Sequence, residues 1–397
     1  MKIRIEKGLA RGSVTVPPSK SVAHRLLICS ALASGESVIS NVPTCEDVEA
    51  TVDALRALGA RIERSGRTYR VLGIDARNRC VGADIYCRES GSTLRFIIPI
   101  LMLSSVEDRL TGAEGLMRRP LDVYEELFSD SVTKDGGAVR VGGELVGGEY
   151  RVPGDVSSQF VSGLLFALPL ARGDSTLIIS EPIESRPYIE LTLGVLNAFG
   201  IEAIWESSNT LKIKGNQEYR STVTTVEGDF SAAAFIEALN LFSGEVCALG
   251  LSDDSRQGDK VYREYFRSLC EGYAELDVSD CPDNAPILFA IAAAMHGATF
   301  TGTRRLKIKE SDRAASMKCE LERLGARVEI YENSVVVGKC ELHAPSSTVN
   351  SHNDHRIAMA MAVLLTRFGG EIEGAEAVAK SYPEFWEHLK ELNITAK

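Results

Sequence analysis

The sequence predicts an α/β (α+β) protein with two domains, each made of three copies of a βαβαββ unit, six copies in all. An almost entirely apolar helical segment recurs six times, followed each time by a strand-like stretch. The copies start at Lys20, Gly91, Ser158, Asp229, Asn284 and Asp354. Their spacings are 71, 67, 71, 55 and 70 residues, each close to one sixth of the chain, which indicates an internal repeat.

The six apolar segments each begin with a short polar or glycine-containing loop and continue for about three to four turns that are apolar almost all round, as is typical of a buried helix. In the first segment, Pro17 and Pro18 stop the preceding chain and Ser19 can cap the helix. The segments are SKSVAHRLLICSALASG, SGSTLRFIIPILMLSS, SSQFVSGLLFALPLARG, GDFSAAAFIEALNLFSG, DNAPILFAIAAAMHG and NDHRIAMAMAVLLTRFGG.

Each buried helix is followed by a strand-like stretch: SVISNV, DRLTG, STLIIS, EVCALG, ATFTGT and EIEGA. A charged loop and an amphipathic helix come next, most clearly in residues 45–60, 185–200 and 309–326. Alternating strands then follow, as in residues 61–73, 209–215 and 327–338.

Two globules of three units bury six such helices more easily than one does. A solenoid is less consistent with the sequence, because solenoid repeats are usually shorter. We expect the chain to cross between globules at Pro17–Pro18 and at residues 226–228. The predicted domains are therefore residues 19–227, and residues 1–18 together with 228–397. Their buried helices direct their N-termini at an interdomain cleft, and each terminus carries ~0.5 of a positive charge.

The composition favours a cytosolic protein that binds small molecules. With 55 acidic and 44 basic side chains, a broad surface for nucleic acid or anionic lipid is not expected. No apolar segment is long enough to span a membrane, and none resembles a secretion signal. Nine cysteines without a C-x-x-C pair predict neither a disulfide framework nor a metal site.

Basic side chains gather at the junctions that precede helices. Because arginine binds carboxylate or phosphate through two parallel hydrogen bonds, and lysine acts as a point charge, these junctions predict anion binding. The residues are Lys20, Arg25, Arg95, Arg118, Arg119, Arg186, Lys309, Arg313, Arg356 and Lys380.

Nine ordered segments resemble signatures of the 5-enolpyruvylshikimate-3-phosphate synthase family, over essentially the whole chain. They are PPSKSVAHR, ESGSTLRF, RRPL, GDVSSQF, ESRPY, VEGDFSAAAF, KESDR, NDHRIAMA and AKSYPEF. The resemblance implies a two-domain inside-out α/β barrel. It also implies transfer of the enolpyruvyl group of phosphoenolpyruvate to the 5-hydroxyl of shikimate-3-phosphate, with release of phosphate. The family needs no cofactor, and we expect a monomer.

The resemblance also implies site residues. For shikimate-3-phosphate they are Lys20, Ser21, Arg25, Ser157, Ser158, Gln159, Ser185, Asp283 and Lys309. For phosphoenolpyruvate they are Lys20, Gly91, Arg119, Gln159, Arg313, Arg356 and Lys380. Departures from the family pattern are Glu89, where many members have Asn, Ser92, where many have Thr, and Arg305, where some have Asn.

The chemistry requires one group to take the hydroxyl proton and another to protonate the methylene carbon. By resemblance, Asp283 is the proton acceptor and Glu310 the proton donor. Glu310 lies between Lys309 and Arg313, and these cations oppose an acid role. Lys20 or His355 could share the transfer, so the donor is left open.

Two alternatives can be weighed from the sequence. UDP-N-acetylglucosamine enolpyruvyl transferases share the chemistry, but they usually have a reactive cysteine shortly before the Arg-Pro loop, and TGAEGLMRRP has none. Their Lys-Asn pair is Lys20-Ser21 here. A non-catalytic sensor of a phosphorylated metabolite is less consistent with the paired proton-transfer candidates Asp283 and Glu310.

Overall fold

The computed structural model describes residues 1–242 and 244–397. The chain divides into two compact units: unit 1 is residues 1–17 with 228–397, and unit 2 is residues 18–227. The first boundary lies between residues 17 and 18, one residue before the expected position between residues 18 and 19. Backbone hydrogen bonds explain this, since Asp229 N donates to Pro17 O (2.9 Å) in unit 1, whereas Ser19 N donates to Glu227 O (2.7 Å) in unit 2.

All six apolar segments form helices that are buried along almost their whole length. Polar side chains cap most of them; for example, Ser19 Oγ accepts from Val22 N and Asp229 Oδ1 accepts from Ala232 N. The prediction of six buried helices is therefore confirmed. They are α1 (Lys20–Leu32), α3 (Gly91–Leu101) and α6 (Ser158–Ala167) in unit 2, and α8 (Phe230–Glu237), α10 (Ala285–Ala294) and α12 (His355–Leu365) in unit 1.

Unit 2 contains three four-stranded sheets of the same design, and a short pair, β3 (Ala33–Ser34) with β15 (Tyr219–Arg220). In each sheet a parallel pair of strands lies next to an antiparallel hairpin. In the first sheet, one strand of the parallel pair is β16, the last strand of the unit. The sheets are β16 (Val223–Thr225), β4 (Glu36–Ser40), β6 (Thr68–Leu72), β5 (Arg61–Ser65); β7 (Asp84–Tyr86), β8 (Asp108–Thr111), β10 (Ala138–Val141), β9 (Val132–Asp135); and β11 (Glu149–Pro153), β12 (Ser175–Ser180), β14 (Thr210–Ile213), β13 (Ala203–Trp205).

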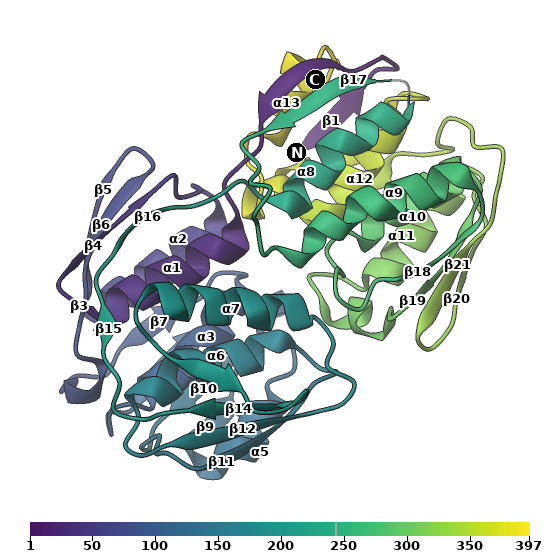
Figure 1. Ribbon diagram of the computed structural model, residues 1–397. Coiled ribbons are helices and arrows are strands. Elements are labelled where there is room, and N and C mark those ends of the chain that lie inside the picture. The colour runs from purple at the N-terminus through teal and green to yellow at the C-terminus, as the bar shows by residue number, and fades with distance from the viewer. Residues whose placement is uncertain (243) are drawn as a thin grey trace. The chain divides into compact units, whose positions relative to one another are not determined.

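Unit 1 has one sheet of the same design and two smaller sheets. Figure 1 shows the four-stranded sheet beside α9, α10 and α11. The sheets are β18 (Ala274–Asp277), β19 (Ala298–Thr301), β21 (Ser334–Val337), β20 (Val328–Ile330); β17 (Glu245–Leu249) with β2 (Arg11–Thr15); and β1 (Lys2–Ile5), β23 (Gly370–Glu373), β22 (Val349–Asn350).

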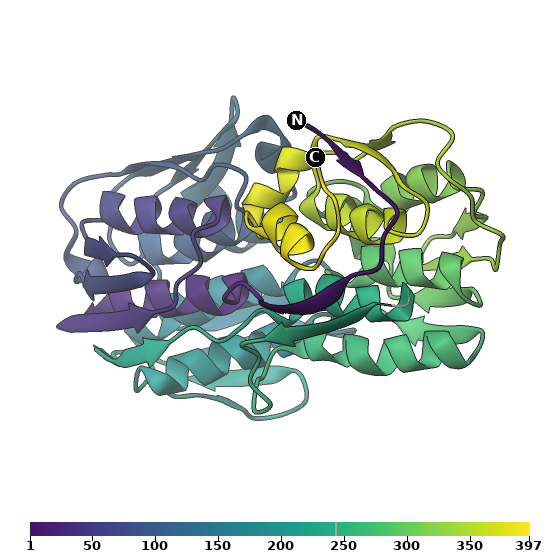
Figure 2. The same cartoon turned by 90° about the horizontal axis from the view of Figure 1, so that it is seen from above.

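The prediction of a complete βαβαββ unit in every copy is wrong for the fourth copy and for the sixth, whose sheet has only three strands among the described residues. In the described residues, the chain passes from α9 (Tyr262–Glu271) directly to β18, the first strand of the next copy, without a hairpin. The missing hairpin explains the short spacing of 55 residues in the sequence. In the sixth copy, the N-terminal strand β1 supplies an antiparallel partner for β23, so the two ends of the chain meet in unit 1 (Figure 2).

The remaining helices are shorter or amphipathic. The three amphipathic segments named above form α2, α7 and α11, which confirms them as helices. Among residues 1–242 and 244–397, no helix has the length and apolar character needed to cross a membrane. These helices are α2 (Glu46–Ala57), α4 (Glu114–Met117), α5 (Asp122–Phe128), α7 (Arg186–Ala198), α9, α11 (Arg313–Glu322), α13 (Phe385–Glu391), and the 3-10 helices η1 (Ala76–Asn78), η2 (Ser129–Ser131), η3 (Leu168–Leu170), η4 (Ala238–Phe242), η5 (Gly258–Val261), η6 (Arg304–Ile308) and η7 (Ala375–Lys380).

We predict that Gly163→Ala destabilises unit 2, because α3 and α6 approach closely at this glycine. A Cβ at Gly163 would lie 2.2 Å from Tyr124 Oη and 2.5 Å from Arg95 O. The free energy of unfolding, measured by denaturant titration, should fall by about 1–3 kcal/mol. Gly115→Ala in α4 is the control, because its Cβ would have no atom within 4 Å. Equal effects of the two changes would contradict this packing.

Candidate active site

The N-termini of five helices meet in unit 2, as their side-chain contacts show. Lys20 at the start of α1 is paired with Asp47 in the first turn of α2, and Thr93 Oγ1 in α3 donates to Asp47 O (3.5 Å). Arg95 in α3 contacts Gln159 in α6, and contacts of Arg25 link α1 to α7. Because these ends carry partial positive charge, the arrangement favours a bound anion.

Lys20 is held in place by a carboxylate. Its Nζ lies 2.8 Å from Asp47 Oδ2, and the two side chains are only 13% and 11% exposed. Asp47 was not predicted as a site residue. The indication in the sequence was that Asp47 lies in the first turn of the amphipathic helix CEDVEATVDALRALGA. An acidic residue at that place is ordinarily explained by its favourable interaction with the helix dipole.

Arg25 is buried, and its side chain donates hydrogen bonds to neutral groups. Its Nε donates to Thr192 Oγ1 (2.8 Å), Nη1 to Ser21 O (2.8 Å) and Nη2 to Tyr188 O (3.0 Å). Burial lowers the pKa of Arg25 to about 10, and Tyr188 and Cys29 act in the opposite direction. Arg25 therefore binds the N-terminal half of α1 to α7 and remains a cation at neutral pH.

Gly91 leaves room for a guanidinium. A Cβ at this position would lie 2.8 Å from Arg119 Nη1 and 3.2 Å from Arg95 Nη1. Arg95 Nη1 donates to Gln159 Oε1 (2.7 Å), and Gln159 Nε2 donates to Ser92 Oγ (3.0 Å). The structure thus brings the predicted residues Gly91, Arg119 and Gln159 together at the adjoining starts of α3 and α6.

The predicted serines of unit 2 lie at helix starts. Ser157 is the N-cap of α6, where its Oγ accepts from Gln159 N (3.3 Å), and Ser158 follows it. Ser185 precedes α7 in a left-handed conformation (φ 58°) and is buried. Hydroxyl groups and the backbone N–H groups of a helix start are the kind of donors that bind a phosphate or carboxylate.

In unit 1, Arg313 joins three carboxylates. This arginine starts α11 and is 1% exposed; its Nε donates to Asp354 Oδ2 (2.9 Å), Nη1 to Asp283 Oδ1 (2.8 Å) and Nη2 to Glu310 Oε2 (2.7 Å). Burial by itself lowers the pKa of Arg313. The attraction of Asp354, Glu310 and then Asp283 outweighs it, so the pKa lies well above its ordinary value.

Asp283, the predicted proton acceptor, is surrounded by cations. Besides Arg313, its other oxygen accepts from Arg356 Nη2 (3.0 Å), and Lys309 Nζ lies 3.9 Å from Oδ1. Its side chain is 22% exposed, whereas Arg356 is 2% exposed. Burial lowers the pKa of Lys309 to about 8; Asp283 opposes the shift and Arg313 adds to it.

The other predicted residues of unit 1 lie close by. Lys380 Nζ, at the end of η7, donates to Asn353 O (2.6 Å), one residue before Asp354, the N-cap of α12. His355 is buried at the start of α12, and its Nδ1 lies 3.9 Å from Asp354 Oδ1. Glu310 Oε2 accepts from Arg313 Nη2 (2.7 Å). The structure therefore gathers Asp283, Lys309, Glu310, Arg313, Arg356 and Lys380 into one cluster.

Two basic side chains of the junctions have other contacts. Arg118 is exposed and forms an i,i+4 ion pair with Glu114 (2.8 Å). Arg186 lies over the Trp205 ring, 4.2 Å from its centroid, and Nη1 donates to Ser208 O (2.6 Å). The clusters at the helix starts therefore contain fewer basic side chains than the ten that the sequence places at the junctions.

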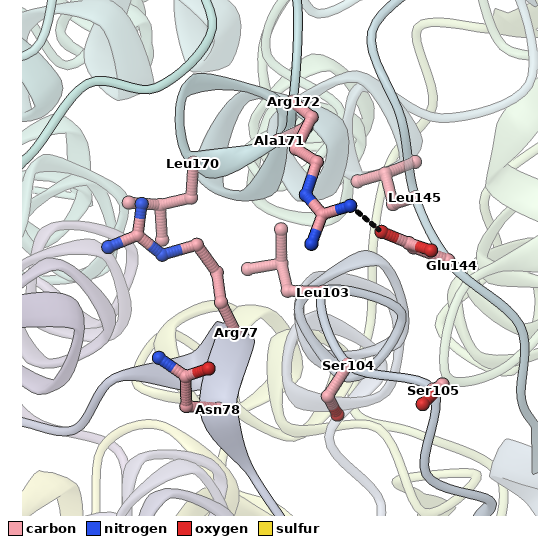
Figure 3. A pocket seen from close by; sticks show the side chains of 10 residues that line it. All are labelled: Arg77, Asn78, Leu103, Ser104, Ser105, Glu144, Leu145, Leu170, Ala171 and Arg172. Carbon is pink, nitrogen blue, oxygen red and sulfur yellow. Dashed lines mark ion pairs between the residues drawn. The ribbon is translucent and has the colours of Figure 1, made fainter.

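Unit 2 also contains a cavity of about 350 Å³ away from these residues (Figure 3). It is lined by residues just after the C-terminal ends of α3 and η3, with Arg77 and the ion pair Arg172–Glu144 (3.6 Å). Helix C-termini carry partial negative charge, which disfavours an anion there. None of the predicted site residues is among the residues that line it.

Comparisons with known proteins identify the family of the chain. A model of the EPSP synthase (3-phosphoshikimate 1-carboxyvinyltransferase) family matches residues 6–389. The 3-phosphoshikimate 1-carboxyvinyltransferase of Clostridium kluyveri is 40% identical, over 96% of this chain and 95% of that protein. The enzyme of that name from Clostridium perfringens (strain SM101) is 39% identical, over 99% and 98% of the two proteins.

A solved structure of EPSP synthase from Acinetobacter baumannii has the same fold. The TM-score is 0.80 at 24% sequence identity, and the match covers 100% of this chain and 99% of that one. The fold, the ordered segments and the relatives lead to the same conclusion: the chain belongs to the EPSP synthase family.

Proposed function

We propose that the cluster in unit 2 and the cluster in unit 1 together bind shikimate-3-phosphate and phosphoenolpyruvate. The reaction of the family is transfer of the enolpyruvyl group to the 5-hydroxyl of shikimate-3-phosphate with release of phosphate, a step of aromatic amino acid biosynthesis. The observation that carries the proposal is the convergence of buried arginines on the starts of buried helices in both units. Two substrates that each have a phosphate and a carboxylate need such groups.

We assign the residues as the sequence resemblance implies. The residues that bind shikimate-3-phosphate are Lys20, Ser21, Arg25, Ser157, Ser158, Gln159 and Ser185 of unit 2, with Asp283 and Lys309 of unit 1. Phosphoenolpyruvate is bound by Lys20, Gly91, Arg119 and Gln159 of unit 2, with Arg313, Arg356 and Lys380 of unit 1.

Substrate binding and proton transfer are coupled in this proposal through Asp283. In the structure both of its carboxylate oxygens accept hydrogen bonds, one from Arg313 and the other from Arg356. An incoming phosphate or carboxylate competes for these guanidinium groups. As they turn to the substrate, the Asp283 oxygens are released from these hydrogen bonds beside Lys309 and can accept the hydroxyl proton. Glu310 is proposed as the donor to the methylene carbon, in the protonated form that it can adopt once Arg313 has turned to the substrate; Lys20 and His355 are the alternatives.

The direct test is release of inorganic phosphate from phosphoenolpyruvate with two alternative acceptors. Phosphate should be released with shikimate-3-phosphate and not with UDP-N-acetylglucosamine. Release only with the second acceptor would replace this proposal by the related sugar-nucleotide reaction, and release with neither would favour a binding protein. The cytoplasmic location and the monomeric state stay predictions.

We predict that Arg119→Ala raises the KM for phosphoenolpyruvate. Loss of a charge-assisted hydrogen bond of roughly 1.5–3 kcal/mol corresponds to about a 10- to 100-fold increase. Steady-state kinetics with each substrate varied in turn give the measurement. Arg118→Ala is a matched control, because Arg118 is the neighbouring arginine but is exposed and paired with Glu114. An unchanged KM in Arg119→Ala would remove Arg119 from the phosphoenolpyruvate site.

We predict that Glu310→Gln lowers turnover by roughly 10²- to 10⁴-fold, the usual contribution of a proton-transfer group. The amide oxygen of glutamine can still accept from Arg313 Nη2, so both KM values should stay within about threefold. Glu322→Gln, at an exposed ion pair with Lys318 on the same helix, is the control. Near-normal turnover in Glu310→Gln would assign the proton to Lys20 or His355.

We predict that kcat/KM for shikimate-3-phosphate falls as pH rises through about 8, by roughly tenfold per pH unit. The lowered pKa of Lys309 leaves the side chain cationic below that pH and neutral above it, and the neutral amine attracts the phosphate less. The substrate phosphate is already fully ionised there, with a second pKa of ≈ 6. In Lys309→Arg the cation persists, so the fall should disappear. A fall retained in that variant would assign it to another group.

A further inference from the structure

The turn between β22 and α12 is held in an unfavourable backbone conformation. His352 (φ 52°) and Asn353 (φ 55°) are consecutive left-handed residues with side chains. Such backbone is disfavoured by contact of Cβ with the peptide, so it persists only where surrounding contacts fix it. The turn leads directly into Asp354, the N-cap of α12 and a partner of Arg313.

Glu320, on α11, holds one side of this turn. Its carboxylate is fully buried; Oε1 accepts from His352 Nε2 (2.7 Å), and Oε2 accepts from Asn350 N (3.1 Å). Arg323 Nε lies 2.9 Å from Oε2 and balances the charge. Because a carboxylate only accepts hydrogen bonds, the histidine Nε2 carries the proton in this contact.

The other side of the turn is held from η7 and the residue before it. Ser351 Oγ donates to Gly374 O (2.9 Å), and Lys380 Nζ donates to Asn353 O (2.6 Å). The turn thus lies between two supports, and one of them is a lysine of the proposed phosphoenolpyruvate site. A change in the turn therefore acts on Lys380, and on Arg356 through the start of α12.

We propose that the Glu320–His352 pair is a positioning element for the phosphoenolpyruvate-binding cations of unit 1. By fixing the left-handed turn, it sets the place of Asp354, and through it Arg313 and Arg356, while keeping Asn353 O against Lys380. The choice of phosphoenolpyruvate rests on the proposed function, whereas the positioning of the turn does not.

Cys319 Sγ lies close enough to Glu320 and His352 for the three to resemble a metal-ligand set, with ligand atoms within 4.8 Å. The sequence predicted no such grouping. Both carboxylate oxygens already accept hydrogen bonds, and Arg323 supplies a positive charge at the place where an ion would bind. These contacts favour a positioning role over a metal site.

The test uses His352, whose side chain is 31% exposed, because replacing the buried Glu320 would leave Arg323 without its carboxylate. His352→Ala removes the contact. His352→Asn also removes it but tolerates the left-handed backbone. His352→Gln can still reach Glu320 with an N–H donor. His343→Ala, at an exposed histidine of the same unit, is the control.

The first readout is hydrogen exchange of residues 350–356 in the full chain without substrates. His352→Ala and His352→Asn should speed exchange there by about tenfold, while His352→Gln and His343→Ala should match the unchanged protein. Unchanged exchange in His352→Ala would overturn the positioning of the turn, whatever reaction the protein catalyses.

The second readout is kinetic. In His352→Ala and His352→Asn, the KM for phosphoenolpyruvate should rise about tenfold, with kcat and the KM for shikimate-3-phosphate changed less than about threefold, and His352→Gln should restore it. Equal loss in both KM values, or a phosphoenolpyruvate KM that does not change, would overturn the assignment to these cations. If the proposed function itself is wrong, the unchanged protein will release no phosphate. The hydrogen-exchange readout can still test the positioning of the turn in that case.

Discussion

The architecture of unit 1 depends on the ion pairs of one buried side chain, Arg313. A guanidinium removed from water is costly unless every donor is matched, and here three carboxylates match it. Asp283 precedes α10, Glu310 precedes α11 and Asp354 caps α12, so one side chain fixes the starts of three helices. Removing any one partner would leave a buried N–H group of Arg313 without its carboxylate acceptor, and the start of that helix would no longer be tied to the other two.

Unit 2 solves the same problem with neutral partners. Arg25 donates to a hydroxyl group and to two backbone carbonyl oxygens, which satisfy its N–H groups without cancelling its charge. Lys20 is the contrasting case, because Asp47 offsets its charge. Unit 2 can therefore attract an anion without first breaking an ion pair at Arg25, whereas in unit 1 an anion must compete with Asp283 for Arg313 and Arg356.

Repetition and local chemistry made much of the fold predictable from the sequence. Six apolar segments with polar caps predicted six buried helices, because such segments can be stable only inside a core. The absent hairpin of the fourth copy was visible only as a short spacing of 55 residues. The position of candidate residues such as Gly91 and Arg313 at helix starts was predictable from the sequence. Asp47 and Glu320 were missed because their partners, Lys20 and His352, are 27 and 32 residues away, and such pairings depend on tertiary packing.

The pairing in unit 1 has a consequence for the order of events in the proposed reaction. An arginine that already has a carboxylate partner binds a second anion less tightly than a free one, since the attraction must be shared or transferred. When the substrate anion takes the place of Asp283 on these arginines, Asp283 is released to act as a base. The proposed site therefore binds the anion less tightly, but its base becomes active only when substrate is bound. In the structure, which contains no substrate, the Asp283 carboxylate accepts hydrogen bonds from two guanidinium groups. In the proposed reaction, the cations that bind the substrate phosphate and carboxylate thereby also control when proton transfer begins.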